Sequence, residues 1–250
     1  MNSQHQQVIS CDARRLSRIR PFLYVAGVKA LSPNALKRFG TVVNLLPSLQ
    51  LYAPSSVRVL NLPVADEEDV DLSPFWQPIF EAIDKERLRR GKLLLLCAKG
   101  ISRSATFAIG YLTCIEKMTL HDAYKHTQRA RSIICPNVGF FRQLIELEIK
   151  MLGQQTVQIV EPMPGVLVAD VLWNELFDEM LAGLSQEERD TLRHNQRFAI
   201  FSFTLQCIFR TSPKEDKKSS ESSLSSLPSF VGDDPSLAVQ FDRLSLSSVP

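Results

Sequence analysis

The stretch LLLLCAKGISRSATFAIGYL, residues 93–112, has three parts: an apolar run, a short loop with one glycine, and an amphipathic segment. The apolar run predicts a buried strand, and the amphipathic segment predicts a helix. Because residues 93–96 are all leucine, the strand is typical of one at the centre of a sheet, covered by helices on both faces. The sequence therefore predicts a strand–loop–helix unit in the core.

The loop CAKGISRS places Cys97 six residues before Arg103. Backbone N–H groups of residues 98–103 can point inward at a bound oxyanion, and Gly100 permits backbone geometry that a side chain would obstruct. The following helix aims its positive N-terminal end at the same point. Arg103 offers a planar fork for two phosphate oxygens. We predict a phosphate cradle made of Ala98, Lys99, Gly100, Ile101, Ser102 and Arg103.

The same field favours a thiolate at Cys97, because a thiolate is itself an anion. A free thiol, with a pKa of about 8.5, is only a few per cent ionised at neutral pH. These surroundings therefore suit a nucleophile that accepts a phosphoryl group and is then freed by water. Ser104 can donate a hydrogen bond to the departing sulfur. The competing interpretation is a buried structural cysteine beside a helix-capping arginine.

Short apolar runs alternate with amphipathic ones around this unit. Strands are predicted at 22–26, 41–46, 57–62 and 92–96. Helices are predicted from Ser73, as N-cap with Pro74 in the first turn, through Leu88, and at 103–117, 120–130 and 138–152. This alternation predicts an α/β fold with a central, mostly parallel or mixed sheet flanked by helices.

The chain divides into four segments by composition and pattern. Residues 1–18 are expected to be flexible, and residues 19–153 to form the main domain. In the extension 154–211, residues 154–169 resemble a strand and turn, and 170–195 look helical. Residues 212–250 hold 12 serines; we expect this tail to be disordered, since it cannot bury enough apolar surface to offset its ordering entropy.

Bulk properties narrow the classes of function. A net charge of +2 argues against a nucleic-acid-binding surface. Residues 1–20 lack an apolar signal-peptide core, and the apolar run at 198–209 is too short to span a bilayer. The five cysteines follow no disulfide or zinc-site spacing. We expect an intracellular protein that resides in the cytoplasm, with the nucleus as an alternative location. We expect no metal, no organic cofactor and no transmembrane segment.

The loop CAKGISRSAT resembles the signature of the protein tyrosine phosphatase superfamily, and within it the dual-specificity phosphatases. PVAD (63–66) resembles the family's general-acid loop, and PNVGF (136–140) lies in AYKHTQRARSIICPNVGFFRQL, which is similar to the family's helix–loop–helix. VGFFRQLIELEIKMLG, with TVQIV and PGVLVADV after it, is similar to the small atypical members, so the resemblance covers about 19–172. It implies a phosphatase-like fold, hydrolysis of phosphotyrosine and phosphoserine/threonine, and phosphorylated proteins, signalling kinases among them, as substrates.

The leaving oxygen needs a proton, and the segment ADEEDVD offers five carboxylates, among which composition cannot choose. The resemblance selects Asp66, with Asp69 next. Crowding by the other carboxylates would favour retention of its proton. Within PNVGF, Asn137 and Gly139 are expected to hold the loop beside the cradle, or simply to begin a helix with Asn137 as N-cap.

One residue departs from the family pattern. Members usually carry His immediately before the catalytic cysteine, where this chain has Leu96, and His121 and His126 are interpreted as surface residues. If the thiol pKa rose by about one unit, about 1.4 kcal/mol, the ionised fraction would fall up to tenfold. We therefore expect reduced activity with an optimum at higher pH. Two alternatives stay open: a phosphoprotein-binding pseudo-enzyme, and a phosphatase for phosphoinositides or RNA 5′ ends.

Overall fold

The computed structural model describes residues 14–163 and 165–173. A five-stranded mixed sheet lies at the centre, with strand order β1-β2-β5-β3-β4. Strands β2, β5, β3 and β4 are parallel, whereas the edge strand β1 runs antiparallel to β2. The strands are β1 (Ser17–Arg20), β2 (Leu23–Gly27), β3 (Thr41–Asn44), β4 (Arg58–Asn61) and β5 (Leu93–Cys97). The predicted mixed α/β sheet is confirmed, and β5 is its central strand.

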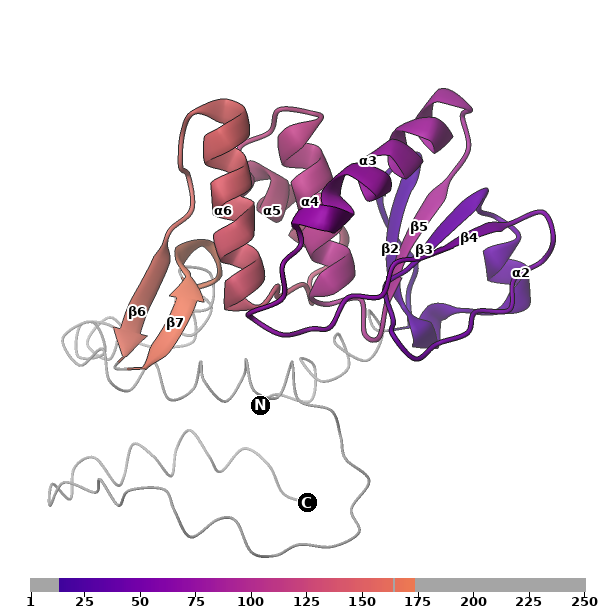
Figure 1. Ribbon diagram of the computed structural model, residues 1–250, viewed down its shortest axis with the longest axis horizontal. Coiled ribbons are helices and arrows are strands. Elements are labelled where there is room, and N and C mark those ends of the chain that lie inside the picture. Colours follow the sequence, from indigo (N-terminus) through magenta and orange to yellow (C-terminus); the bar gives the residue numbers. More distant parts are fainter. Residues whose placement is uncertain (1–13, 164, 174–250) are drawn as a thin grey trace, which may run out of the picture. The chain divides into compact units, whose positions relative to one another are not determined.

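Four helices lie on one side of the sheet (Figure 1). They are α3 (Ser73–Leu88), α4 (Arg103–Cys114), α5 (Leu120–Ala130) and α6 (Val138–Leu152). The outermost, α6, packs on α4. All twelve residues of α4 are buried, as expected for a helix surrounded by other elements. Helix α4 packs against β5, α5 and α6, so the loop that joins β5 to α4 emerges from the most constrained part of the core.

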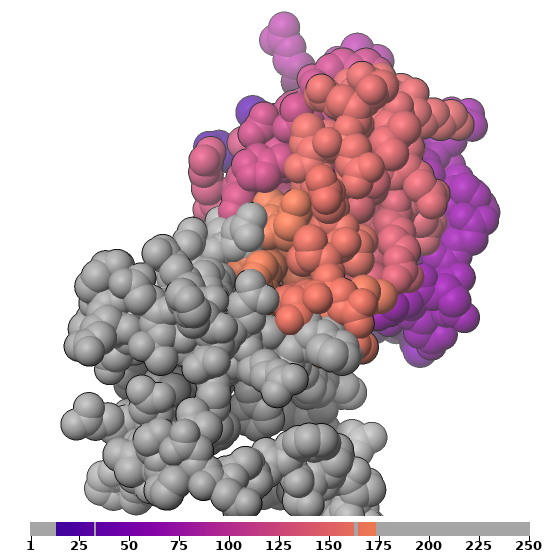
Figure 2. Space-filling view, turned by 90° about the vertical axis from the view of Figure 1, so that its left-hand side faces the viewer, coloured from indigo at the N-terminus to yellow at the C-terminus, as the bar shows by residue number. Residues whose placement is uncertain are grey.

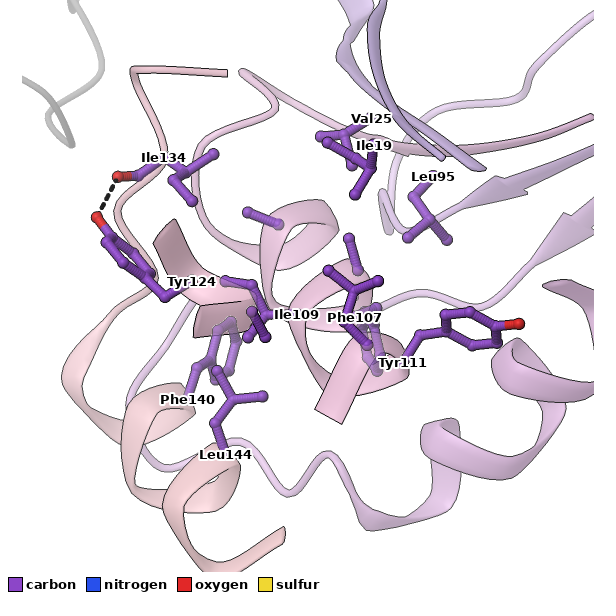
Figure 3. Packing of buried hydrophobic residues seen from close by; sticks show 14 of the residues in the cluster. Ile19, Val25, Leu95, Phe107, Ile109, Tyr111, Tyr124, Ile134, Phe140 and Leu144 are labelled. Carbon is purple, nitrogen blue, oxygen red and sulfur yellow. Dashed lines mark hydrogen bonds between the residues drawn. The ribbon is translucent and has the colours of Figure 1, made fainter. Parts of the chain in front are cut away.

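The leucines of β5 alternate between two apolar clusters. Leu93, Leu95 and Cys97 face the large helix-side cluster, part of which is drawn in Figure 3. Leu94 and Leu96 face a smaller cluster on the other side. That second face is covered by the short helix α2 (Pro33–Leu36), the turn η1 (Val28–Ala30) and loop residues, not by a full helix as expected.

Helix α3 has the predicted bounds, but the roles of its first and last residues differ from the prediction. The helix begins at Ser73, but Ser73 is not its cap: the Asp71 carboxylate accepts hydrogen bonds from the Ser73 N–H at 2.8 Å and from its hydroxyl at 2.7 Å. Leu88 is 81% exposed. It lies nine residues after buried Ile79, about two and a half turns, and therefore on the opposite side of the helix.

Structure extends beyond both ends of the segment 19–153. Strand β1 begins at Ser17, inside the stretch expected to be flexible, and Ser17 is buried. At the other end β6 (Ile159–Met163) and β7 (Val166–Ala169) form an antiparallel hairpin. Four residues of this region lie in the helix-side cluster, namely Val157, Ala169, Val171 and Leu172.

The hairpin packs on α6 (Figure 2). The described part of the extension 154–211 therefore belongs to the same core as the main domain. The rest of the expected helical segment, the apolar run at 198–209 and the serine-rich tail lie outside the described residues. In the part of the chain that is described, no helix is both long and apolar enough to cross a membrane.

Candidate active site

Each carbonyl of the loop from Ala98 to Ser102 accepts a hydrogen bond from a neighbouring element. The donors are Val28 N to Ala98 O at 3.2 Å, Arg131 Nη2 to Lys99 O at 2.8 Å, Arg131 Nε to Gly100 O at 2.5 Å, Cys135 N to Ile101 O at 3.0 Å, and Thr106 N to Ser102 O at 2.9 Å. In a planar trans peptide the C=O and N–H point in opposite directions. The N–H groups of residues 99–103 therefore face away from these donors, and that of Gly100 points at the sulfur of Cys97.

The Cys97 side chain lies inside this loop. Its Sγ atom is 3.2 Å from the N–H of Gly100 and 3.1 Å from the Ser104 hydroxyl, and both groups can donate to a thiolate. The residue ends β5 and is 1% exposed. The sulfur therefore has two hydrogen-bond donors and little contact with bulk water.

Gly100 is required by the close packing of this loop. Its φ is +69°, and a Cβ atom would stand 2.7 Å from both Ala26 C and Gly27 N in β2. A side chain at residue 100 would therefore be strained by its backbone and would also collide with the neighbouring strand. The glycine that the sequence analysis singled out is thus explained by a tertiary contact as well as by conformation.

Arg103 is the first residue of α4, and its side chain is turned inward. Its Nη1 donates to Val64 O at 3.0 Å, and its Nε lies 3.5 Å from Asp66 Oδ2. That ion pair lacks hydrogen-bond geometry: among the described residues, Nε is one of two buried side-chain N or O atoms without a partner. A buried guanidinium with an unused N–H beside the loop suits an anionic ligand.

The structure brings Asp66 to the rim of the loop. Its Oδ1 accepts from the Ser102 hydroxyl at 2.6 Å and from Asn137 Nδ2 at 3.2 Å. The sequence suggested crowding by other carboxylates, but the groups that contact Asp66 are donors. Asp71 is occupied by Ser73, whose hydrogen bonds hold the Asp71 pKa below its ordinary value.

The PNVGF element fulfils both of its predicted roles. Asn137 caps α6, accepting from Phe140 N at 2.8 Å, while its amide contacts Asp66. Gly139 packs directly on the acid loop: a Cβ atom there would stand 1.8 Å from Glu68 O. Gln143 adds a contact that the sequence did not indicate, accepting from Leu72 N and donating to Val70 O.

Two basic residues near the cradle were also not singled out by the sequence. Arg131 binds two carbonyls of the loop. The only indication of this role in the sequence was that Arg131 lies in the segment 123–144, which resembles the family. Lys29 follows β2 and interacts electrostatically with Lys99. The pKa of Lys99 is lowered, first by burial; Asp66 raises it and Lys29 lowers it further.

The interpretation of His126 as a surface residue is wrong. Its ring is half-buried, lies 2.9 Å from Ile19 O and contacts Arg20. The residue stands on the face of α5 that packs on β1, which a local pattern does not reveal. His121 is exposed, as expected. No group of three potential metal ligands occurs within residues 14–163 and 165–173.

Comparisons with known proteins place the chain beside phosphatase sequences. The model of the dual specificity phosphatase catalytic domain matches residues 22–150. Uncharacterized protein ZK757.2 of Caenorhabditis elegans is 51% identical over 187 residues, which are 75% of this chain and 64%, just under two thirds, of that protein. Dual specificity protein phosphatase 18 of Bos taurus is 36% identical, over 61% of this chain and 82% of its own.

A solved structure is similar as well. The crystal structure of human tyrosine phosphatase-like serine/threonine/tyrosine-interacting protein superposes with a TM-score of 0.52 at 28% identity. The match covers 56% of this chain and 99% of that one. The central sheet and its helices are therefore an arrangement already known in phosphatase-like proteins.

Proposed function

Since this chain belongs to the dual specificity phosphatase family, we propose that it hydrolyses phosphotyrosine and phosphoserine/threonine in proteins through a cysteinyl-phosphate intermediate on Cys97. As an enzyme, the chain is classed as a protein phosphatase, which is a hydrolase. The observation that carries the proposal is the set of five anchored carbonyls, which turns the N–H groups of residues 99–103 away from the carbonyls' donors, with the Gly100 N–H directed at the sulfur of Cys97. Such a ring suits a phosphate dianion.

In the first step, the Cys97 thiolate attacks phosphorus. The S–P bond forms, the P–O bond to the substrate breaks, and Asp66 gives its proton to the leaving oxygen. The amides of residues 99–103 and the Arg103 guanidinium stabilise the charge on the transferring group. The position of Asp66 beside Arg103 and Ser102 supports this role.

In the second step, water attacks the cysteinyl phosphate. The S–P bond breaks, its electron pair returns to sulfur, and Asp66 accepts a proton from the water. The Ser104 hydroxyl, 3.1 Å from Sγ, stabilises the departing thiolate. Inorganic phosphate then leaves the cradle.

The test is phosphate release from a phosphotyrosine peptide and a phosphothreonine peptide of otherwise identical sequence. Wild type is expected to act on both, Cys97→Ser on neither, and Asp66→Ala is expected to be slower by roughly 10²- to 10⁴-fold. Equal, background-level release by wild type and Cys97→Ser would exclude the proposal.

A second candidate, a phosphoprotein-binding protein with little turnover, is favoured by Leu96 and by the similarity to a protein named as phosphatase-like and interacting. In that case wild type and Cys97→Ser would both bind the phosphopeptides, and neither would release phosphate. A phosphatase for non-protein esters would instead release phosphate from phosphoinositides or RNA 5′ ends while leaving both peptides intact.

Leu96 stands where family members usually have a histidine, and we expect this to affect the pH dependence of the reaction. The side chain is fully buried in the apolar cluster behind the sheet, with Tyr24 and Phe39, and it cannot donate a hydrogen bond. We expect Leu96→His to raise the rate near pH 6, measured as a pH–rate profile, while lowering the melting temperature because an imidazole replaces a packed leucine. An unchanged profile would reject a role for residue 96 in setting the pH optimum.

A further inference from the structure

Arg131 has a fully buried guanidinium whose three nitrogen atoms all donate hydrogen bonds. Nε and Nη2 bind the carbonyls of Gly100 and Lys99, and Nη1 binds Arg15 O at 3.1 Å and the Ser17 hydroxyl at 3.2 Å. A charge removed from water is costly unless it is well hydrogen-bonded. Four bonds to fixed partners meet that condition and set the orientation of the guanidinium.

One peptide unit connects this guanidinium to the reactive sulfur. The carbonyl of the peptide between Lys99 and Gly100 accepts from Arg131 Nη2 at 2.8 Å, and the N–H of the same peptide donates to Cys97 Sγ at 3.2 Å. Hydrogen bonds in series polarise one another in a low-dielectric interior. A positive charge at the carbonyl end therefore makes the N–H a stronger donor to an anionic sulfur.

The fork of the guanidinium also fixes the geometry of the loop. The carbonyls of Lys99 and Gly100 are adjacent, and a planar group with several N–H donors can hold both at once. A lysine ammonium could supply the charge but is a single point on a flexible stem. The contacts of Nη1 with Arg15 and Ser17 hold the other side of the fork against β1.

We propose that Arg131 is a positioning residue that holds the amides of the cradle inward and stabilises the Cys97 thiolate through the peptide between Lys99 and Gly100. This inference rests on the proposed function, since it assigns a role to the thiolate. Arg131 itself does not touch the substrate; it acts through the loop.

The test measures the pH dependence of Cys97 alkylation by iodoacetamide, followed by mass spectrometry of the Cys97 peptide, in the full-length chain. We expect Arg131→Met to shift this profile to higher pH by about one unit, which is about a tenfold slower reaction at neutral pH. Arg131→Lys should shift it less. Arg129→Met is the matched control, since Arg129 is an exposed residue in the last turn of α5, two positions before Arg131; it should leave the profile unchanged.

Folding is checked in each variant by its thermal unfolding transition. If Arg131→Met does not fold, Arg131→Lys carries the test. A folded variant with the wild-type alkylation profile would overturn the inference, because loss of a merely structural contact would lower stability without moving the profile. Alkylation needs no turnover, so this result is distinguishable from failure of the phosphatase proposal.

Discussion

Among single residues, glycines mark where the catalytic segments touch. Gly100 lies against β2 and Gly139 lies against the acid loop, and in both cases a Cβ atom would overlap backbone atoms. Backbone cannot rotate away as a flexible side chain can, so a methyl group at either position must move a loop. The two positions therefore report on the cradle and on the acid loop separately.

We predict that Gly139→Ala slows catalysis, because the added methyl group would push Glu68 and the acid loop away from α6 and thus displace Asp66. Turnover of phenyl phosphate should fall by roughly tenfold or more, and turnover of p-nitrophenyl phosphate less, because a better leaving group depends less on a general acid.

The control is Gly153→Ala. Gly153 is the C-cap of the same helix α6, with φ +69°, and a Cβ atom there meets nothing within 4 Å. This variant should lose stability through backbone strain and keep the wild-type ratio between the two substrates. Equal losses for both substrates in Gly139→Ala would contradict a specific effect on the acid.

Among the elements, α6 joins the site to the rest of the domain. Its N-cap Asn137 and its second residue Gly139 lie beside the acid loop, and its last turns carry the fully buried Glu148. The Glu148 carboxylate accepts from Leu120 N at 2.7 Å, from Thr156 N at 2.8 Å and from the Thr156 hydroxyl at 2.6 Å. The carboxylate thereby satisfies the free backbone N–H at the start of α5 and anchors the segment that leads to the hairpin.

We predict that Glu148→Ala lowers the free energy of unfolding by about 3 kcal/mol, because it leaves the buried N–H of Leu120 and the half-buried N–H of Thr156 without this partner. Urea denaturation measures this change. Glu146→Ala, at an exposed position of the same helix, should stay within about 0.5 kcal/mol of wild type. Similar losses in the two variants would show that the carboxylate network is not the cause.

At the scale of the whole domain, the described structure does not end with α6. The segment after it returns to the core, where Val157, Val171 and Leu172 are each less than a tenth exposed. Burying such side chains contributes about 1.5–3 kcal/mol each. The hairpin region is thus part of the domain that carries the site.

A chain that ends at Gly153 is therefore predicted to be less stable than one that ends at Trp173. The expected difference in the free energy of unfolding is on the order of 5 kcal/mol, an upper estimate because an unfolded chain already buries some apolar surface. Urea unfolding of the two chains measures it. Coincident unfolding curves would mean that the core does not depend on the segment after α6.

The sequence by itself determined the strand–loop–helix unit around Cys97, the central place of β5 and the helices around the sheet. These features follow from the local periodicity of apolar residues and from the chemistry of residues that lie close together in the sequence. The tertiary structure alone decided which distant groups meet: Arg131 with the carbonyl of Lys99, 32 positions away, and Asn137 with Asp66, 71 positions away. It also half-buried His126, exposed Leu88 and placed the Asp71 carboxylate on the N–H and hydroxyl of Ser73 at the start of α3. Such contacts depend on how elements pack in space, and packing is not encoded in the spacing of residues along a single element.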